Sequence, residues 1–447
     1  MIGSVISDIL VALLVLGVII VIHELGHFLV AKYFKIRVET FSVGMGPRVV
    51  GYRRGETDYR ISAFPIGGYV KMSGETPGDA VTGDPHEFMS KPKWQRFLVA
   101  SAGPAMNIVL AVGLLTGLYV YGTEVPDISG AAVVGIVRPD SPAASTGIQP
   151  GDIILSLNGK ERPAWLDIET TIVTNPDRPL PLVLERNGER IETSITPQRS
   201  GPSETGYGGL FPVLRVLVHR VQPGSPAEAA GVKPGDEIVA VKGADLTNAG
   251  KSIQEVIQTV PEKTFPITVL RKNAETQAVE KVDLEVTPTL QGGRRMLGFE
   301  YGHPTRLIKL GLGAAFQQAL ETNATYAVLI FDVLGKLVTR DLSMKSIDGP
   351  IGIVRVSGQA LDLGLGTLIT TAAMISLNLG LINLLPIPIL DGGVMLMLAL
   401  EGLFRRDISL RMKERIVQVS FVFLLMLTVF VLYNDVVKLF PSNIQAP

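Results

Sequence analysis

Two histidines and a glutamate near the start of the chain have the types and spacing of a hydrolytic metal site. They are His23, Glu24 and His27, in the sequence His-Glu-Leu-Gly-His. Residues four apart lie on one face of a helix, so both imidazoles can bind the same ion. Glu24 then lies beside a metal-bound water, whose pKa a zinc ion lowers to about 7, and can take its proton. The motif predicts a zinc cofactor, with Glu24 as the catalytic base.

A catalytic zinc ion takes a third protein ligand and keeps one position for water. The chain has no cysteine, which excludes thiolate ligands and cysteine nucleophiles. The other histidines, His86, His219 and His303, are expected to be ordinary surface or core residues. Asp391, in the sequence Leu-Asp-Gly-Gly, is therefore the expected third ligand. The alternative is that Asp391 caps the helix that follows it.

The segments that carry these residues are apolar enough to cross a membrane. The chain is 47% hydrophobic and 19% charged, against about 25% charged in soluble proteins. A span needs about 20 apolar residues, and the sequence predicts four transmembrane helices, at residues 1–34, 97–122, 366–393 and 413–437. The first has no basic residue before it and no cleavage site after it, so we expect a retained helix rather than a signal peptide.

The third predicted span is interrupted by polar residues and prolines, namely Asn378, Asn383, Pro386 and Pro388. Backbone breaks at membrane depth are tolerated only where they line protein or a wet cavity. Ionisable groups inside a membrane are functional by default. We therefore expect the interruption to hold Asp391 within the site.

Lysine and arginine are concentrated in residues 32–96 and 405–415. Basic loops stay in the cytoplasm, which places both termini and the long middle region on the outer side. Residues 35–96 also alternate like strands and predict a β-rich, membrane-associated region on the cytoplasmic side. Its last strand contains a set of candidate substrate contacts: Gly67, Gly68, Tyr69, Val70 and Lys71. Such a strand could hold an extended substrate by strand addition; the alternative is that its glycines only form a turn.

The middle of the chain contains an internal repeat. Ser-Pro-Ala occurs at 141–143 and again at 225–227, and each copy is followed at the same offsets by a glycine and by Pro-Gly-Asp. A strand, a short Ser-capped helix, a glycine stop and a second strand form a small mixed domain, and this pattern resembles PDZ domains. We expect PDZ-like domains at 123–200 and 210–290. They could bind peptide C-termini or filter substrates by size.

Residues 305–340 have an amphipathic pattern. This pattern predicts a peripheral helix on the membrane surface, or one whose apolar stripe packs against protein.

Several of these motifs together resemble the site-2 protease family of zinc intramembrane proteases. The His-Glu motif is accompanied by NLGLINLLPIPILDGG at 378–393. Further landmarks are Ala-Gly-Pro at 102–104, Asn107, Gly-Gly-Tyr-Val-Lys-Met at 67–72 and Gly-Pro-Ile-Gly at 349–352. The resemblance covers essentially the whole chain. It implies that His23, His27 and Asp391 bind zinc and that Glu24 is the catalytic base. Relatives commonly have histidine where this chain has Val394.

The resemblance also implies a fold and a set of partners. The expected fold is a multi-pass α-helical protein of the bacterial inner membrane, with a membrane-associated β-hairpin, periplasmic termini and two periplasmic PDZ-like α+β domains. The expected substrates are single-span membrane proteins already trimmed outside, such as an anti-sigma factor, and signal-peptide remnants. The net charge of -1 gives no reason to expect nucleic acid.

Two asparagines of the third span are candidates for stabilising the oxyanion. Asn383 is the first choice and Asn378 the second, because an amide can donate to the developing charge. Asparagines in membrane helices also hydrogen-bond to neighbouring helices, and this alternative applies to both.

Two other classes of protein fit part of the pattern. A catalytically inactive membrane scaffold with PDZ repeats would need neither Glu24 nor Asp391. A soluble-type zinc protease tethered by helices would have its third ligand shortly downstream, where Glu39 is the nearest acid and lies among strand-like residues. The sequence favours a composite metal site within the bilayer.

Overall fold

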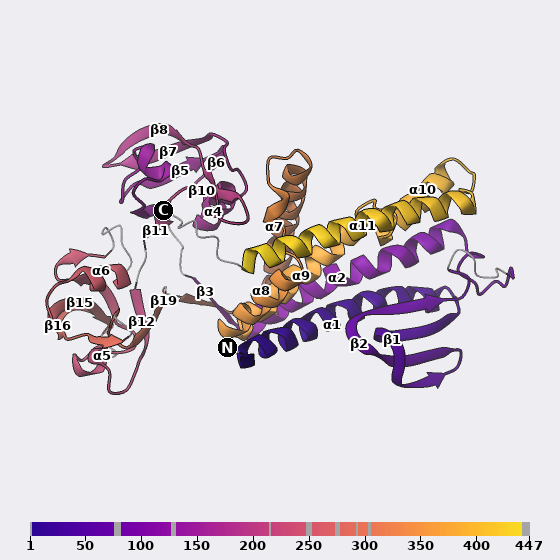
Figure 1. Ribbon diagram of the computed structural model, residues 1–447, viewed down its shortest axis with the longest axis horizontal. Coiled ribbons are helices and arrows are strands. Elements are labelled where there is room, and N and C mark those ends of the chain that lie inside the picture. Colours follow the sequence, from indigo (N-terminus) through magenta and orange to yellow (C-terminus); the bar gives the residue numbers. More distant parts are fainter. Residues whose placement is uncertain are drawn as a thin grey trace. The chain divides into compact units, whose positions relative to one another are not determined.

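The computed structural model describes residues 2–75, 82–126, 131–213, 216–246, 253–272, 278–291, 294–302 and 305–439. The chain forms two compact units. The first contains the long apolar helices and one sheet, and the second contains most of the strands (Figure 1). The metal-binding candidates all lie in the first unit.

Four helices of the described chain are long and apolar enough to cross a membrane. They are α1 (Ile2–Tyr33), α2 (Lys93–Tyr121), α9 (Leu365–Asn383) and α11 (Leu410–Leu439). Helix α2 packs against both α1 and α9. Its Ala111 and Leu115 are buried together with Ala373 and Leu377 of α9. Small residues at this contact let the helices approach closely.

The third apolar segment is broken, as its prolines predict. Helix α9 ends at Asn383, and α10 (Asp391–Leu403) begins after a short non-helical stretch. Pro386 and Pro388 have no backbone N–H to continue a helix. The start of α10 is pressed against this stretch, because a Cβ on Gly392 would lie 2.3 Å from the Leu384 oxygen. Close packing therefore fixes where Asp391 begins its helix.

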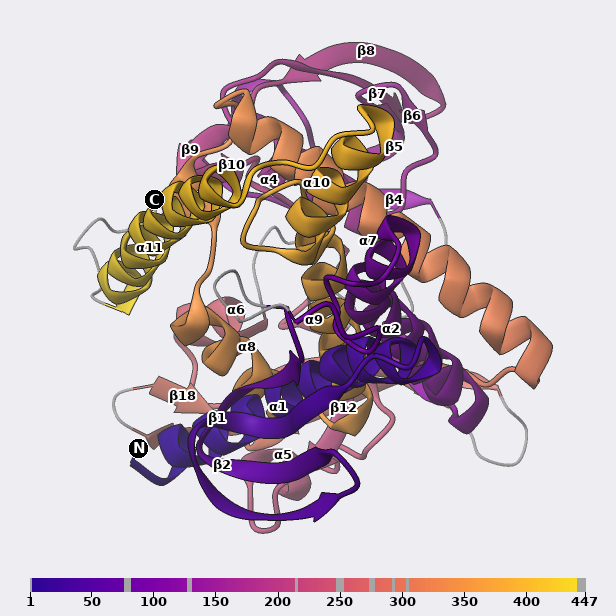
Figure 2. The same cartoon turned by 90° about the vertical axis from the view of Figure 1, so that its right-hand side faces the viewer.

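Strands β1 (Val38–Arg54) and β2 (Thr57–Met72) form one antiparallel sheet that folds back on itself. Residues 40–43 of β1 pair with 58–61 on one side and with 68–71 on the other. Segment 68–72 is therefore an edge, and we call it the edge strand. Gly44 and Gly46, with φ of +85° and +91°, allow the bend. The sheet contacts α1 and lies beside it (Figures 1 and 2).

Two further helices belong to the first unit in whole or in large part. Helix α7 (Leu312–Val338) lies within the stretch that predicted a peripheral helix, and its Ala319 is buried with α2 and α9, so part of its stripe packs against protein. Helix α8 (Pro350–Asp362) was not predicted. Its first turn is capped by Asp435 of α11, whose carboxylate accepts from the Gly349 and Ile351 amides at 2.9 Å.

The second unit contains two six-stranded sheets with the same plan. The first has the order β11-β4-β5-β7-β8, with β6 on β5, and the second β16-β15-β13-β12-β19, with β14 on β13. The strands of the first are β4 (Ala132–Val137), β5 (Ile153–Leu157), β6 (Lys160–Glu161), β7 (Leu180–Arg186), β8 (Glu189–Ile195) and β11 (Leu210–Pro212). Those of the second are β12 (Val216–Val221), β13 (Glu237–Val241), β14 (Ala244–Asp245), β15 (Phe265–Lys272), β16 (Val279–Val286) and β19 (Phe299–Gly302).

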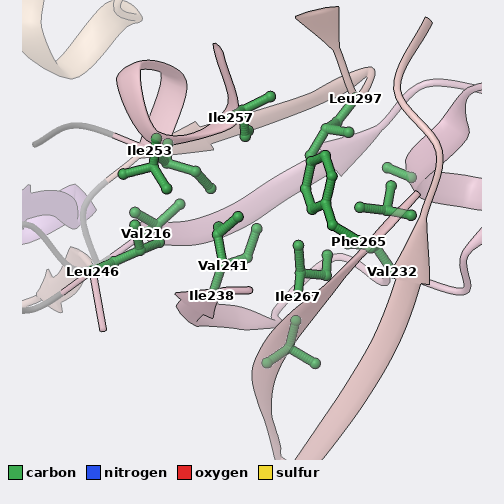
Figure 3. Packing of buried hydrophobic residues seen from close by; sticks show 14 of the residues in the cluster. Val216, Val232, Ile238, Val241, Leu246, Ile253, Ile257, Phe265, Ile267 and Leu297 are labelled. Atoms are coloured by element: carbon green, nitrogen blue, oxygen red, sulfur yellow. The ribbon is translucent and has the colours of Figure 1, made fainter. Parts of the chain in front are cut away.

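Each sheet has its own helices and its own hydrophobic core. The helices are α3 (Pro142–Ser145) and α4 (Trp165–Val173) in the first domain, and α5 (Pro226–Ala229) and α6 (Ile253–Thr259) in the second. In the second core, Phe265 lies among Ile257, Leu297 and Ile267 (Figure 3).

Short pairs link and flank the sheets: β9 (Gln198–Ser200) with β10 (Thr205–Tyr207), β17 (Thr289–Gln291) with β18 (Arg294–Met296), and β3 (Thr123–Pro126) with β20 (Thr305–Ile308).

The repeated Ser-Pro-Ala motif begins a short helix in both domains. Ser141 and Ser225 each cap a short helix by accepting from an amide three residues on. The sheets extend beyond the predicted limits of 200 and 290, because β11 and β19 close them. Strands of three or four residues are too short to show an alternating pattern, which is why the sequence did not mark them.

Candidate metal centre

Three side chains from two distant segments converge in the first unit. The ligand atoms of His23, His27 and Asp391 all lie within 4.8 Å of one another. Asp391 Oδ2 is 3.1 Å from His23 Nε2, and its Oδ1 is 3.5 Å from His27 Nε2. The two Nε2 atoms are 3.2 Å apart. One turn of α1 and the first residue of α10 thus build a set of two imidazoles and a carboxylate.

The helix-capping alternative for Asp391 does not describe its position. The N-cap of α10 is Leu390, and Asp391 is the first helical residue. Its carboxylate faces the histidines instead. Two imidazoles and a carboxylate are a donor set that suits zinc.

Helix α2 orients both histidines through their second ring nitrogens. His27 Nδ1 lies 2.8 Å from the Val99 oxygen, so it carries the hydrogen and leaves the Nε2 lone pair facing Asp391. His23 Nδ1 lies 3.1 Å from Asn107 Nδ2. The Asn107 Oδ1 atom is buried and has no hydrogen-bond partner among the residues that the structure describes. If the side-chain amide oxygen and nitrogen of Asn107 are exchanged, the oxygen accepts a hydrogen bond from His23 Nδ1–H. In this tautomer, the lone pair of His23 Nε2 can bind a metal.

Two glycines allow the helices to come this close. A Cβ on Gly103 would lie 2.3 Å from His27 Nε2 and 2.7 Å from His23 Nε2. A Cβ on Gly26 would lie 2.3 Å from the Ala102 oxygen. The Ala-Gly-Pro landmark and Asn107 therefore shape the site, a role that sequence patterns alone did not assign to them.

Glu24 lies next to the histidines but points to the edge strand. Its Oε2 accepts a hydrogen bond from the Val70 amide at 3.1 Å. A cavity of about 520 Å³ adjoins both groups. It is lined by the metal-binding candidates and Glu24, by Tyr69 and Val70, and by Val394. A carboxylate beside the converged ligands, with a cavity in front, can take a proton from water held there.

The other predicted contact residues, Gly67, Gly68 and Lys71, are not among the residues that line this cavity. Gly67 has a φ of +83° and turns the chain into the edge strand. Gly68 fits closely, because a Cβ there would lie 2.9 Å from the Ser42 oxygen. Lys71 points elsewhere and pairs with Glu39 at 2.9 Å. The glycine segment thus contains both a turn and a strand.

The two asparagines of α9 are not among the residues that line the cavity. Asn383 is the last residue of α9 and is partly buried, whereas Asn378 is exposed. Of the other histidines, His86 pairs with Asp84 at 2.9 Å in an exposed loop. His303 lies outside the described residues.

Several cavity residues were not anticipated from the sequence. Glu75 lines the cavity, and burial raises the pKa of its carboxyl to about 6. Arg96 is 7% exposed, and its Nε has no partner among the described residues. Glu401 is 1% exposed and pairs with Lys413 at 2.6 Å. These residues come from separate segments with no common motif, so only the fold brings them together.

Comparison with known proteins gives matches along nearly the whole chain. A family model described as peptidase family M50 matches residues 11–427. The regulator of sigma E protease of Haemophilus influenzae is 31% identical, over 96% of this chain and 98% of its own length. The regulator of sigma-E protease RseP of Escherichia coli is 31% identical, over 95% and 97%. A putative zinc metalloprotease of Treponema pallidum is 29% identical, over 97% and 99%.

Proposed function

This chain belongs to peptidase family M50 and is a metalloprotease, and from that premise we propose that it is a zinc-dependent protease that cuts peptide bonds within transmembrane segments. The observation that carries the proposal is that Asp391, at the start of α10, meets His23 and His27 of α1, one of the helices apolar enough to span a membrane. Ligands placed within such helices would act on substrates that enter the same layer.

Zinc is proposed from the donor set and from relatives whose names include zinc metalloprotease. His23, His27 and Asp391 would hold the ion. When bound, it polarises the scissile carbonyl and lowers the pKa of water. Glu24 takes the proton of the attacking water and returns it to the leaving nitrogen as the C–N bond breaks. The Val99 oxygen and Asn107 keep the imidazoles in the tautomer this requires.

Asn383, with Asn378 second, is proposed to donate to the oxyanion. Asn383 ends α9 directly before the broken stretch that leads to Asp391. A small movement of that stretch on substrate binding would bring its amide to the cavity. Asn378 would then remain a helix-packing residue.

The edge strand is proposed to bind the substrate by strand addition. A transmembrane helix hides its peptide bonds in its own hydrogen bonds and must unwind before hydrolysis. The Val70 N–H points away from the rest of the sheet and donates to Glu24, so a new strand would reach it by replacing that carboxylate. Val70→Pro removes this N–H and should lower cleavage while zinc content is kept; unchanged cleavage would contradict strand addition.

The second unit is proposed to be a pair of PDZ-like domains on the periplasmic side of the bacterial inner membrane, with periplasmic chain termini. Substrates would be pre-trimmed single-span proteins, such as an anti-sigma factor, and signal-peptide remnants. A size filter fits such substrates better than a peptide-binding groove. Deleting residues 127–300 should increase cleavage of an untrimmed substrate, whereas loss of all cleavage would indicate recruitment instead.

The central experiment is Glu24→Gln with a single-span reporter, together with metal analysis. Loss of the base should lower cleavage at least about 100-fold with one zinc ion per chain retained. If the variant cleaves as well as the wild type, the protein is not a protease of this mechanism. If the wild type neither cleaves nor binds zinc, the alternative of an inactive membrane scaffold holds.

A further inference from the structure

The outer side of the edge strand is occupied by two carboxylates of the protein itself. The Val70 amide donates to Glu24 Oε2 at 3.1 Å, and the Met72 amide donates to Glu75 Oε2 at 3.2 Å. Both carboxylates line the same cavity. An exposed edge normally presents unpaired N–H groups. Here the chain supplies its own acceptors for two of them.

The alternation of the strand shows that these two amides face outwards. Successive residues of a strand direct their N–H groups to opposite sides. The Ser73 amide, on the inner side, donates to the Arg37 oxygen at 2.9 Å. Val70 and Met72 are two residues apart, so their N–H groups lie about 7 Å apart along the strand. This is the repeat at which an added strand presents its carbonyl oxygens.

Glu75 reaches this position from just beyond the end of β2. It is partly buried and shares the cavity with Glu24 and Asp391. Both carboxylates, together with burial, oppose ionisation of Glu75, whereas the Met72 amide and His27 favour it. Arg96 and the Glu401–Lys413 pair also line this cavity. The hydrogen bond from the Met72 amide therefore favours the ionised form of the Glu75 carboxyl, which burial and the two neighbouring carboxylates disfavour.

We propose that Glu75 is a displaceable occupant of the substrate edge, whose carboxylate stands where a substrate carbonyl oxygen will lie. The Val70 and Met72 amides then mark two successive backbone contacts of the bound substrate. The first lies at the catalytic base and the second two residues away. This inference rests on the proposed function, because it needs strand addition to occur.

An occupant of this kind affects binding rather than chemistry. The substrate must break the Glu75–Met72 hydrogen bond before it docks, and this raises KM. Among the described residues, Glu75 makes no hydrogen bond to the metal-binding candidates or to Glu24, so kcat should change little. Glu75 is a positioning residue and not a catalytic one.

The test compares three variants in the full-length, zinc-loaded enzyme with a single-span reporter. Glu75→Ala removes the acceptor, and KM should fall about three- to tenfold, as a typical intramolecular hydrogen bond is worth, with kcat within about twofold. Glu75→Gln keeps a neutral acceptor and should give an intermediate KM. Glu39→Ala is the matched control, because Glu39 is a carboxylate of the same sheet that pairs with Lys71; its KM should equal that of the wild type.

A KM that is unchanged or raised in Glu75→Ala, with zinc content intact, would overturn the proposal. Absence of cleavage by the wild type would instead overturn the proposed function, so the two failures are distinct.

Amide exchange gives a readout that needs no catalysis. In Glu75→Ala without substrate, the Met72 amide should exchange faster than in the wild type. Adding the reporter should keep Met72 protected in Glu24→Gln and should restore its protection in the Glu24→Gln, Glu75→Ala double variant. Exchange at Met72 that is the same with and without Glu75 would show that the hydrogen bond does not exist in solution.

Discussion

Buried and partly buried carboxylates are used in opposite ways in the two units of the molecule. In the two sheet domains of the second unit, Asp152 and Asp236 are each 1% exposed and held by Arg186 and Arg271. Each also accepts a backbone amide at 2.8 Å. In the first unit, Glu24, Asp391 and Glu75 line a cavity, and among the described residues none of them pairs with lysine or arginine.

The difference separates a structural role from a chemical one. A carboxylate whose oxygens are all hydrogen-bonded within the protein has no acceptor free for a ligand, and its role is to fix a turn between strands. A carboxylate that faces a cavity with imidazoles or amides keeps acceptor capacity for a metal, a proton or a substrate. The Asp–Arg pair occurs in both domains, as a structural role predicts. The cavity carboxylates come from separate segments of the chain, as a chemical role predicts.

Removing the carboxylate proposed to bind the metal should abolish activity and leave folding intact. In Asp391→Asn, zinc content should fall, and cleavage should drop at least about 1,000-fold, because the metal supplies several kcal/mol of transition-state stabilisation. Metal analysis and reporter cleavage measure the two effects. Full zinc content in this variant would mean that Asp391 is not a ligand.

Removing a paired carboxylate should have the reverse effect. Asp236→Asn leaves Arg271 without its ion pair and should destabilise the second sheet domain by about 3 kcal/mol, with zinc content unchanged. Limited proteolysis of the full chain would report it as faster cleavage of residues 216–302. Asp152→Asn is the matched variant in the other domain. If both variants were as stable as the wild type, Asp152 and Asp236 would not have the structural role that distinguishes them from the cavity carboxylates.

Crowding of the imidazoles can be tested without touching a carboxylate. Gly103→Ala places a Cβ 2.3 Å from His27 Nε2 and should weaken zinc binding about 10- to 100-fold, as changes that disturb ligand orientation do. Gly113→Ala, on the same helix with nothing within 4 Å of the added Cβ, is the control. Equal zinc affinity in the two variants would show that α2 does not press on the site.

The smallest expected effect is the pH dependence of Glu75. Burial raises the pKa of this carboxyl to about 6, so it is ionised at pH 8 and becomes neutral as the pH falls through 6. The ratio of wild-type KM to that of Glu75→Gln should therefore fall from about threefold at pH 8 towards one below pH 6. Using the ratio cancels titration of groups common to both enzymes. A ratio constant across this range would show that the charge of Glu75 does not matter.

Local patterns predicted much of this molecule. Spacing of four placed His23 and His27 on one helical face, and the prolines before Asp391 predicted the break between α9 and α10. The repeated Ser-Pro-Ala motif predicted two copies of one small domain. Helix α8 was missed because its start depends on Asp435, a partner far along the chain. Asn383 and Asn378 were proposed from their position in a motif, and neither lines the cavity. Whether a residue lines a cavity depends on tertiary packing, which a local motif does not determine.

The sequence by itself determined which residues could perform chemistry and which segments could enter a membrane, because helical periodicity and apolar length are local properties. Only the tertiary structure decided which of them meet. It brought Asp391 to the histidines, placed Gly103 where a side chain would collide with them, and directed Glu24 and Glu75 to alternate amides of one strand. These contacts join distant segments, and their geometry depends on how helices and strands pack rather than on any spacing along the chain.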